Sequence, residues 1–202
     1  MQQRYLELDT ATNMIHLAVN GHASNRRLCK QDQATVATAG ALMGFSAAVI
    51  EQQLKYFLAR VVTVASEIEL ETRFSPEKLY KPLIRVVGLE PPFRTFLKDL
   101  TSGSAAGAVF TYIDRPEIKQ CKKTINSALS KLIQAVDMLP KKAAERDRLR
   151  PTEIETLMKG MLKPKLLEVE ADLGGALKYA KAIREKAETE WRDCVESLKK
   201  CC

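Results

Sequence analysis

Histidine is scarce in this chain, which leaves few ways to build the common catalytic groupings. The 202 residues include only two histidines, His16 and His22, both near the N-terminus. General acid–base pairs, Cys–His dyads and Ser–His–Asp triads need an imidazole held beside a second functional side chain. No Glu-x-x-His sequence of the kind found in di-iron bundles occurs either. We therefore predict a protein that is not an enzyme and has neither a metal site nor a cofactor.

Phosphate-binding glycine motifs and paired cysteines are also missing. No Walker or dinucleotide-binding glycine pattern occurs, and none of the five cysteines belongs to a Cys-x-x-Cys sequence. Arg4, Glu7 and Asp9 interrupt the first stretch before an apolar run develops, which does not fit a secretory signal. The cysteines are thus expected to be reduced thiols of a cytoplasmic protein.

Long apolar runs are absent, with one borderline case. Residues 33–50 carry no charge, and this length is close to that of a membrane-spanning helix. The segment is rich in alanine, threonine, glycine and serine, and its amphipathic pattern continues past Glu51 into charged sequence. It predicts a buried helix of a soluble protein rather than a membrane span.

Seven-residue repeats of apolar side chains dominate the rest of the chain. The rows comprise Met43, Ile50, Phe57 and Val64; Ile118, Ile125, Leu132 and Leu139; and Leu166, Leu173, Ala180 and Ala187. This spacing is typical of amphipathic helices that pack along a seam. We predict an all-α helical bundle with three long helices, at about 33–72, 116–139 and 164–199, and several short ones.

Proline and glycine divide the remaining sequence. They predict a short helix from Pro76 to Val87 that ends at Gly88, another that opens at Pro91-Pro92, and a third before Pro164. Residues 1–20 fit either a small β-hairpin or a helix, since such short runs do not distinguish the two periods. The organisation expected is one helical domain over 1–202, with an N-terminal arm or hairpin at 1–30 and an exposed tail at 196–202.

Most of the net charge of +7 lies in residues 115–150, which hold ten basic and four acidic side chains. A local excess of cations attracts anions such as phosphate groups. No aromatic residue lies between 113 and 178, so stacking of nucleic-acid bases is not indicated. The predicted anion-binding or nucleic-acid-binding residues form a basic strip: Lys119, Lys122, Lys123, Lys131, Lys141, Lys142, Arg146, Arg148 and Arg150.

Small residues indicate a surface for helix association. Gly40 and Gly44 lie four residues apart in a run of alanine, serine and threonine, a spacing that lets a second helix approach closely. With the apolar residues Met43, Ile50 and Phe57 they form the predicted association surface, either within the bundle or between subunits.

The last four residues, Lys199-Lys200-Cys201-Cys202, resemble the doubly prenylated terminus of Rab-family small GTPases. The resemblance covers only these residues, because the chain has no GTPase glycine motif. It implies that Cys201 and Cys202 are candidates for lipidation, which would associate the protein with a membrane through its tail.

Together these features predict a non-enzymatic helical association or scaffold protein whose basic strip contacts an anionic partner. Further copies of the chain or another helical protein are the expected partners. Two alternatives stay open. One is a nucleic-acid-binding structural protein of the nucleocapsid or coat type, which contacts RNA or DNA backbone, and the other is a peripheral membrane protein with a lipidated tail.

Overall fold

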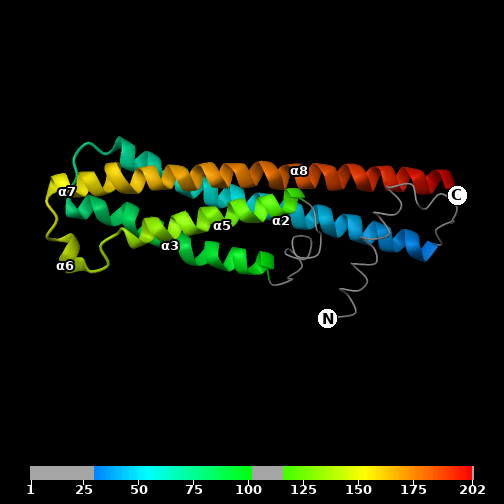
Figure 1. The fold of residues 1–202 in the computed structure, drawn as a ribbon, viewed down its shortest axis with the longest axis horizontal. Helices are drawn as coiled ribbons and strands as arrows, with labels where there is room; N and C mark the ends of the chain where they lie inside the picture. The colour runs from blue at the N-terminus through cyan, green and yellow to red at the C-terminus, as the bar shows by residue number, and fades with distance from the viewer. Residues whose placement is uncertain (1–29, 102–115, 202) are drawn as a thin grey trace.

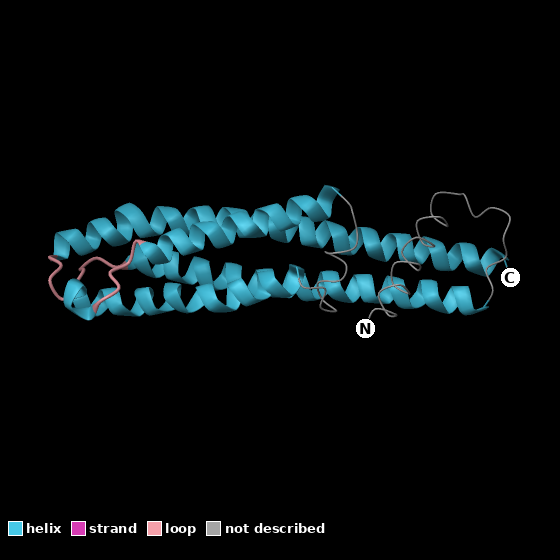
Figure 2. Cartoon of the chain, turned by 60° about the horizontal axis from the view of Figure 1, so that its bottom comes forward, coloured by secondary structure: helices cyan, strands magenta, loops and turns pink. Residues whose placement is uncertain are grey.

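The computed structural model describes residues 30–101 and 116–201, and this part of the chain is built of helices. No strand occurs in these two ranges (Figure 2), which confirms the predicted all-α bundle. The predicted hairpin within 1–20 lies outside the described residues. The elements are α2 (Lys30–Leu70), α3 (Pro76–Thr101), α5 (Pro116–Asp137), α6 (Ala143–Arg146), α7 (Pro151–Glu155), the π-helical segment η1 (Thr156–Leu162) and α8 (Lys163–Cys201).

Four helices, α2, α3, α5 and α8, pack into an antiparallel bundle (Figure 1). α8 lies between α2 and α5, and α3 contacts the same two helices on the other side. The chain reverses direction from each of the four to the next, so every neighbouring pair is antiparallel. α2 and α8 extend past α3 and α5 at the end of the molecule that carries the C-terminus, while α6 and α7 lie at the opposite end.

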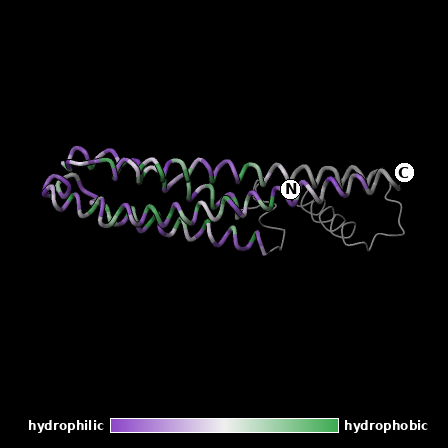
Figure 3. The backbone as a smooth tube through the Cα atoms, turned by 90° about the horizontal axis from the view of Figure 1, so that it is seen from above, coloured by the Kyte–Doolittle hydropathy of each residue, from purple (hydrophilic) through white to green (hydrophobic). Residues whose placement is uncertain are grey.

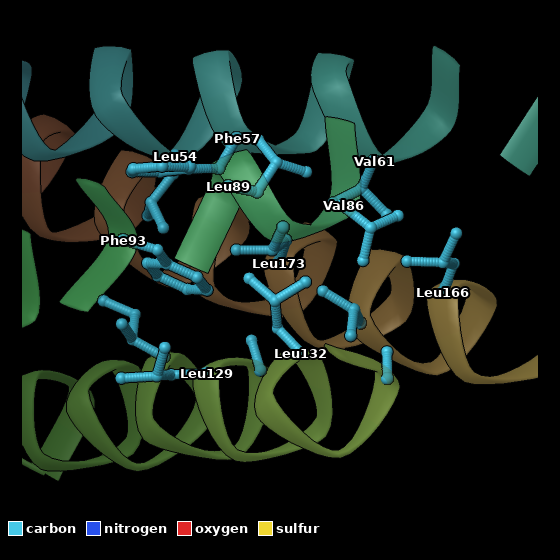
Figure 4. Close-up of a cluster of buried hydrophobic side chains, with 14 of the residues drawn as sticks. Leu54, Phe57, Val61, Val86, Leu89, Phe93, Leu129, Leu132, Leu166 and Leu173 are labelled. Atoms are coloured by element: carbon cyan, nitrogen blue, oxygen red, sulfur yellow. The ribbon is translucent and has the colours of Figure 1, made fainter. Parts of the chain in front are cut away.

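The core is formed by the apolar repeats, whose described side chains turn inward. In Figure 4, side chains from α2, α3, α5 and α8 converge, among them Leu54, Phe93, Leu132 and Leu173. Apolar and polar residues alternate along the helices (Figure 3), as this burial requires. The ring of Phe57 stacks on that of Phe93, with centroids 4.7 Å apart. Burial of each such side chain stabilises the fold by about 1.5–3 kcal/mol.

α3 is one helix where the sequence predicted two shorter ones. It continues through Gly88 and carries Pro82, Pro91 and Pro92 inside it. A proline in a helix interior costs about 3 kcal/mol, because it removes a hydrogen bond and crowds the preceding turn. The helix persists because a continuous apolar face holds it against the bundle: Leu79, Leu83, Val86, Leu89, Phe93, Phe96 and Leu100 are all buried.

The last long helix, α8, begins at Lys163, next to the predicted start at Pro164, but no break separates it from the short helix before it. Residues 151–201 form one continuous helical rod in which α7 passes through η1 into α8. Pro164 has no N–H and would crowd the carbonyl four residues back in a regular α-helix. In η1 the N–H of Lys163 instead donates to the carbonyl of Met158, five residues back. Residues 196–201, predicted as tail, continue this helix.

The buried positions explain why a π-helical segment forms here. Successive buried residues before and within α8 are Ile154, Met158, Leu162, Leu166, Val169, Leu173, Ala176 and Ala180. From Leu166 onward the spacing alternates between three and four, as a helix seam requires. Before Leu166 the buried residues are four apart three times in succession. Compared with the alternation of three and four, this segment holds one extra residue. The wider π turn absorbs that residue and keeps both ends of the seam in the core.

Candidate anion-binding surface

The structure separates the predicted basic strip into two groups. Lys119, Lys122 and Lys123 lie in the first turns of α5, whereas the residues from Lys141 to Arg150 lie beyond its other end, in and around α6. α5 has 22 residues, which corresponds to about 33 Å. The two groups are therefore distinct surfaces. We call Lys119, Lys122 and Lys123 the α5 lysine cluster.

Three of the predicted cations form ion pairs within the chain. Lys131 lies between the two groups and pairs with Asp172 of α8 at 2.8 Å. Lys141 pairs with Asp137 at 3.3 Å, and Arg150 pairs with Glu153 at 3.1 Å. The Lys131 and Asp172 side chains are only 28% and 20% exposed, so the middle of the predicted strip is neutralised.

The group around α6 is also balanced by nearby acids. Glu153 accepts a hydrogen bond from the backbone N–H of Arg150 at 2.7 Å, and this bond holds the pKa of its carboxyl below the ordinary value. Glu145 and Asp147 lie between the cations of the same connection and are both exposed. The connection therefore presents mixed charge instead of a cationic surface.

Arg146 has a structural partner that the sequence did not reveal. Its guanidinium lies over the ring of Tyr80 in α3, 5.3 Å from the ring centroid. This cation–π contact fixes α6 against the start of α3. No sequence signal identified it, because Tyr80 is far from the aromatic-free basic segment.

The α5 lysine cluster has a different environment. Lys119 and Lys123 are exposed, and Lys122 is half-buried. Burial lowers the pKa of Lys122, and no carboxylate among the described residues forms an ion pair with it. A partly desolvated ammonium group without a counter-ion is stabilised by binding an anion. Nearby, Glu117 is held by Lys186 of α8 at 3.3 Å.

The predicted association surface divides between the core and residues whose side chains the structure does not describe. Ile50 is fully buried and Phe57 is 2% exposed, so both are used within this chain. A Cβ placed on Gly44 would meet no described atom within 4 Å, and the close crossing expected there stays a prediction. The side chain of Met43 and the surroundings of Gly40 are not described. At Gly175 of α8, a Cβ would lie 3.5 Å from Thr124 of α5, an ordinary van der Waals distance.

Cys121 also lies in this contact between α5 and α8. Its thiol donates to the carbonyl of Ala176 at 3.5 Å, and burial raises the pKa of the thiol to about 12. It is thus an unreactive core residue. The side chains of the lipidation candidates lie outside the described part of the chain. The structure describes only the backbone of Cys201, at the end of α8, and it does not describe Cys202.

The described residues form neither a membrane-spanning helix nor a metal site. None of the helices within 30–101 and 116–201 combines the length and apolar character needed to cross a membrane. In the same ranges, no three His, Cys, Asp or Glu side chains gather closely enough to bind a metal ion.

No protein-family model, no curated protein and no solved structure matches this chain.

Proposed function

We propose that this protein is a non-enzymatic helical association protein that binds an anionic partner through the α5 lysine cluster. The observation that carries the proposal is the half-buried ammonium group of Lys122, which has no ion pair with a described residue and lies between two exposed lysines.

The cluster is a better candidate than the connection around α6. In that connection Lys141 and Arg150 are in ion pairs, Arg146 stacks on Tyr80, and Glu145 and Asp147 offset the remaining charge. Partner phosphates or carboxylates would have to displace these contacts. At the start of α5, Lys122 forms no ion pair with a described residue, so an anion bound to it displaces no described counter-ion.

The test compares two variants with the same net charge. One replaces Lys119, Lys122 and Lys123 by Gln, and the other replaces Lys141, Lys142 and Arg148 by Gln. Binding to fluorescein-labelled single-stranded RNA and to phosphatidylserine vesicles is measured by anisotropy and by sedimentation, at several salt concentrations. The proposal predicts that only the first variant binds more weakly, and that the salt dependence of its RNA binding becomes shallower by a slope of about 2.1.

The outcomes separate the candidate partners. Salt-dependent binding to RNA of any base composition supports a nucleic-acid backbone, because counterion release at the phosphates does not depend on the base. Binding to the vesicles alone supports a membrane surface. Equal loss in both variants, or no loss in the first, contradicts the proposal.

A further inference from the structure

α3 presents a second, outward-facing stripe of side chains, opposite the face that it buries. The members of this α3 stripe are all exposed: Glu77, Tyr80, Ile84, Val87, Pro91 and Arg94. Their spacings alternate between three and four residues, as in one seam of a coiled coil. The stripe covers about 26 Å of helix at 1.5 Å per residue.

The centre of the α3 stripe is apolar. Tyr80 is 51% exposed, Ile84 is 48% exposed and Val87 is 40% exposed. These three lie within two turns of one helix, and Arg146 of α6 lies over the ring of Tyr80 at one end of the row. Exposed single apolar residues are common on protein surfaces, but an aligned row of this kind marks a surface for interaction.

The spacings between the residues of the α3 stripe are the same when counted from either end. Spacings of three, four, three, four and three have a centre between Arg85 and Val86. A twofold axis at that centre aligns Ile84 of one helix with Val87 of a second, antiparallel copy. It also aligns Tyr80 with Pro91, so the apolar residues of both copies meet in the middle.

The charges at the two ends favour the same alignment. Glu77 opens the stripe and forms no ion pair with a described residue, and Arg94 closes it. The Arg94 side chain is 59% exposed and contacts only Glu90 of its own helix, at 2.6 Å. An antiparallel pair places each Glu77 opposite the Arg94 of the other copy, whereas a parallel pair would place like charges together.

We infer that the occupant of this surface is a second copy of the chain, which pairs α3 with α3 in antiparallel orientation about a twofold axis. Such an interface is self-complementary, as closed dimers require. It is also small, because it involves one helix from each copy, which is typical of a weak dimer that dissociates on dilution. The anion-binding proposal does not depend on this pairing.

Sedimentation velocity of the full chain over a concentration series tests the inference. The unmodified chain should pass from monomer to dimer as its concentration rises, and Ile84→Glu should remain monomeric. The matched control is Leu167→Glu on α8, where the native side chain is 46% exposed. It should dimerise like the unmodified chain. A chain that stays monomeric throughout, or an Ile84→Glu variant that still dimerises, overturns the inference. Because residue 84 is half exposed, the circular dichroism of this variant should be unchanged.

Charge reversal tests the antiparallel alignment. Glu77→Arg and Arg94→Glu should each weaken the dimer by about fivefold, since each creates two like-charge contacts per dimer. The double variant restores opposite charges and should return the dissociation constant to within about twofold of the unmodified value. Single variants without effect, or a double variant as weak as the singles, contradict this alignment.

Discussion

At the scale of single residues, Glu51 shows how an apolar seam tolerates a charge. Its side chain is 8% exposed and lies between α2 and α8. It pairs with Lys55 at 2.6 Å and accepts a hydrogen bond from Nε of Arg184 at 2.8 Å. Hydrogen bonds from Lys55 and then Arg184 hold the pKa of Glu51 below its ordinary value of 4.5. A buried carboxylate is tolerated here because it has two partners.

This ion pair makes stability depend on pH in a defined direction. Since the folded pKa of Glu51 is depressed, its contribution is complete above the unfolded value near 4.5 and is lost as the pH falls through the folded pKa. Glu51→Gln should reduce the free energy of unfolding at pH 7 by about 1–2 kcal/mol. Between pH 7 and pH 3 it should lose less stability than the unmodified chain, as urea denaturation would show.

Glu188→Gln is the matched control for this change. Glu188 also pairs with Arg184, at 2.9 Å, but its side chain is 48% exposed. Its replacement should cost no more than about 0.5 kcal/mol at pH 7. An equal effect from both substitutions would show that burial of the pair at Glu51 is unimportant.

At the scale of elements, the π-helical segment η1 is explained by one extra residue in the buried seam. Gly160 is exposed and lies within it, four residues before Pro164. Its removal leaves Met158 and Leu162 three residues apart, which restores the alternation of three and four. The same removal closes the π turn and brings the ring of Pro164 against a backbone carbonyl.

The effect of deleting Gly160 on the free energy of unfolding should therefore depend on which residue stands at 164. Alone, the deletion should lower the free energy of unfolding by about 3 kcal/mol, because the proline now interrupts a regular α-helix. Combined with Pro164→Ala, the deletion should recover most of this loss. Thermal unfolding of the deletion, the substitution and the combination provides the comparison. If the effects of the deletion and of Pro164→Ala on stability simply add, η1 does not accommodate the proline.

The sequence predicted the helices whose apolar repeat is regular. It missed features that depend on packing or on contacts between distant segments. Ile50 and Phe57 follow a strict repeat and are buried as expected. α3 was divided in two because local proline preferences oppose helix, whereas the packing of its apolar face decides the outcome. The contact of Arg146 with Tyr80 joins distant segments, so local patterns carry no trace of it. The excess of basic residues at 115–150 is visible in the sequence, but the ion pair of Lys131 with Asp172 depends on the fold.

At the scale of the whole molecule, an aromatic cluster links α2 to α3. The ring of Phe57 stacks on Phe93 at 4.7 Å and lies 5.7 Å from Phe96. α3 makes fewer contacts with its neighbours than α8 does, so this cluster is a large part of what holds it in the bundle. Offset aromatic pairs add about 0.5–1.5 kcal/mol beyond the area that they bury.

Phe57→Ala should lower the free energy of unfolding by about 3–5 kcal/mol, as for other fully buried aromatic residues. Chemical denaturation followed by circular dichroism and by hydrogen exchange measures the effect. Val62→Ala, also in α2 but 37% exposed in the native chain, should cost less than about 0.5 kcal/mol. If the four helices form one cooperative unit, protection in α3 and in α8 should fall together in Phe57→Ala. A loss of protection from hydrogen exchange that is confined to α3 would show that α3 unfolds separately.

The pairing of α2 with α8 has a consequence for protein synthesis. α2 ends at Leu70, and its most extensive partner spans Lys163–Cys201. A ribosome adds about 5–20 residues per second, so on the order of ten seconds separate the emergence of these two helices. Throughout that interval the apolar seam of the nascent α2 lacks the helix that covers it. For chaperones that bind exposed apolar segments, α2 is therefore a defined target until α8 leaves the ribosome.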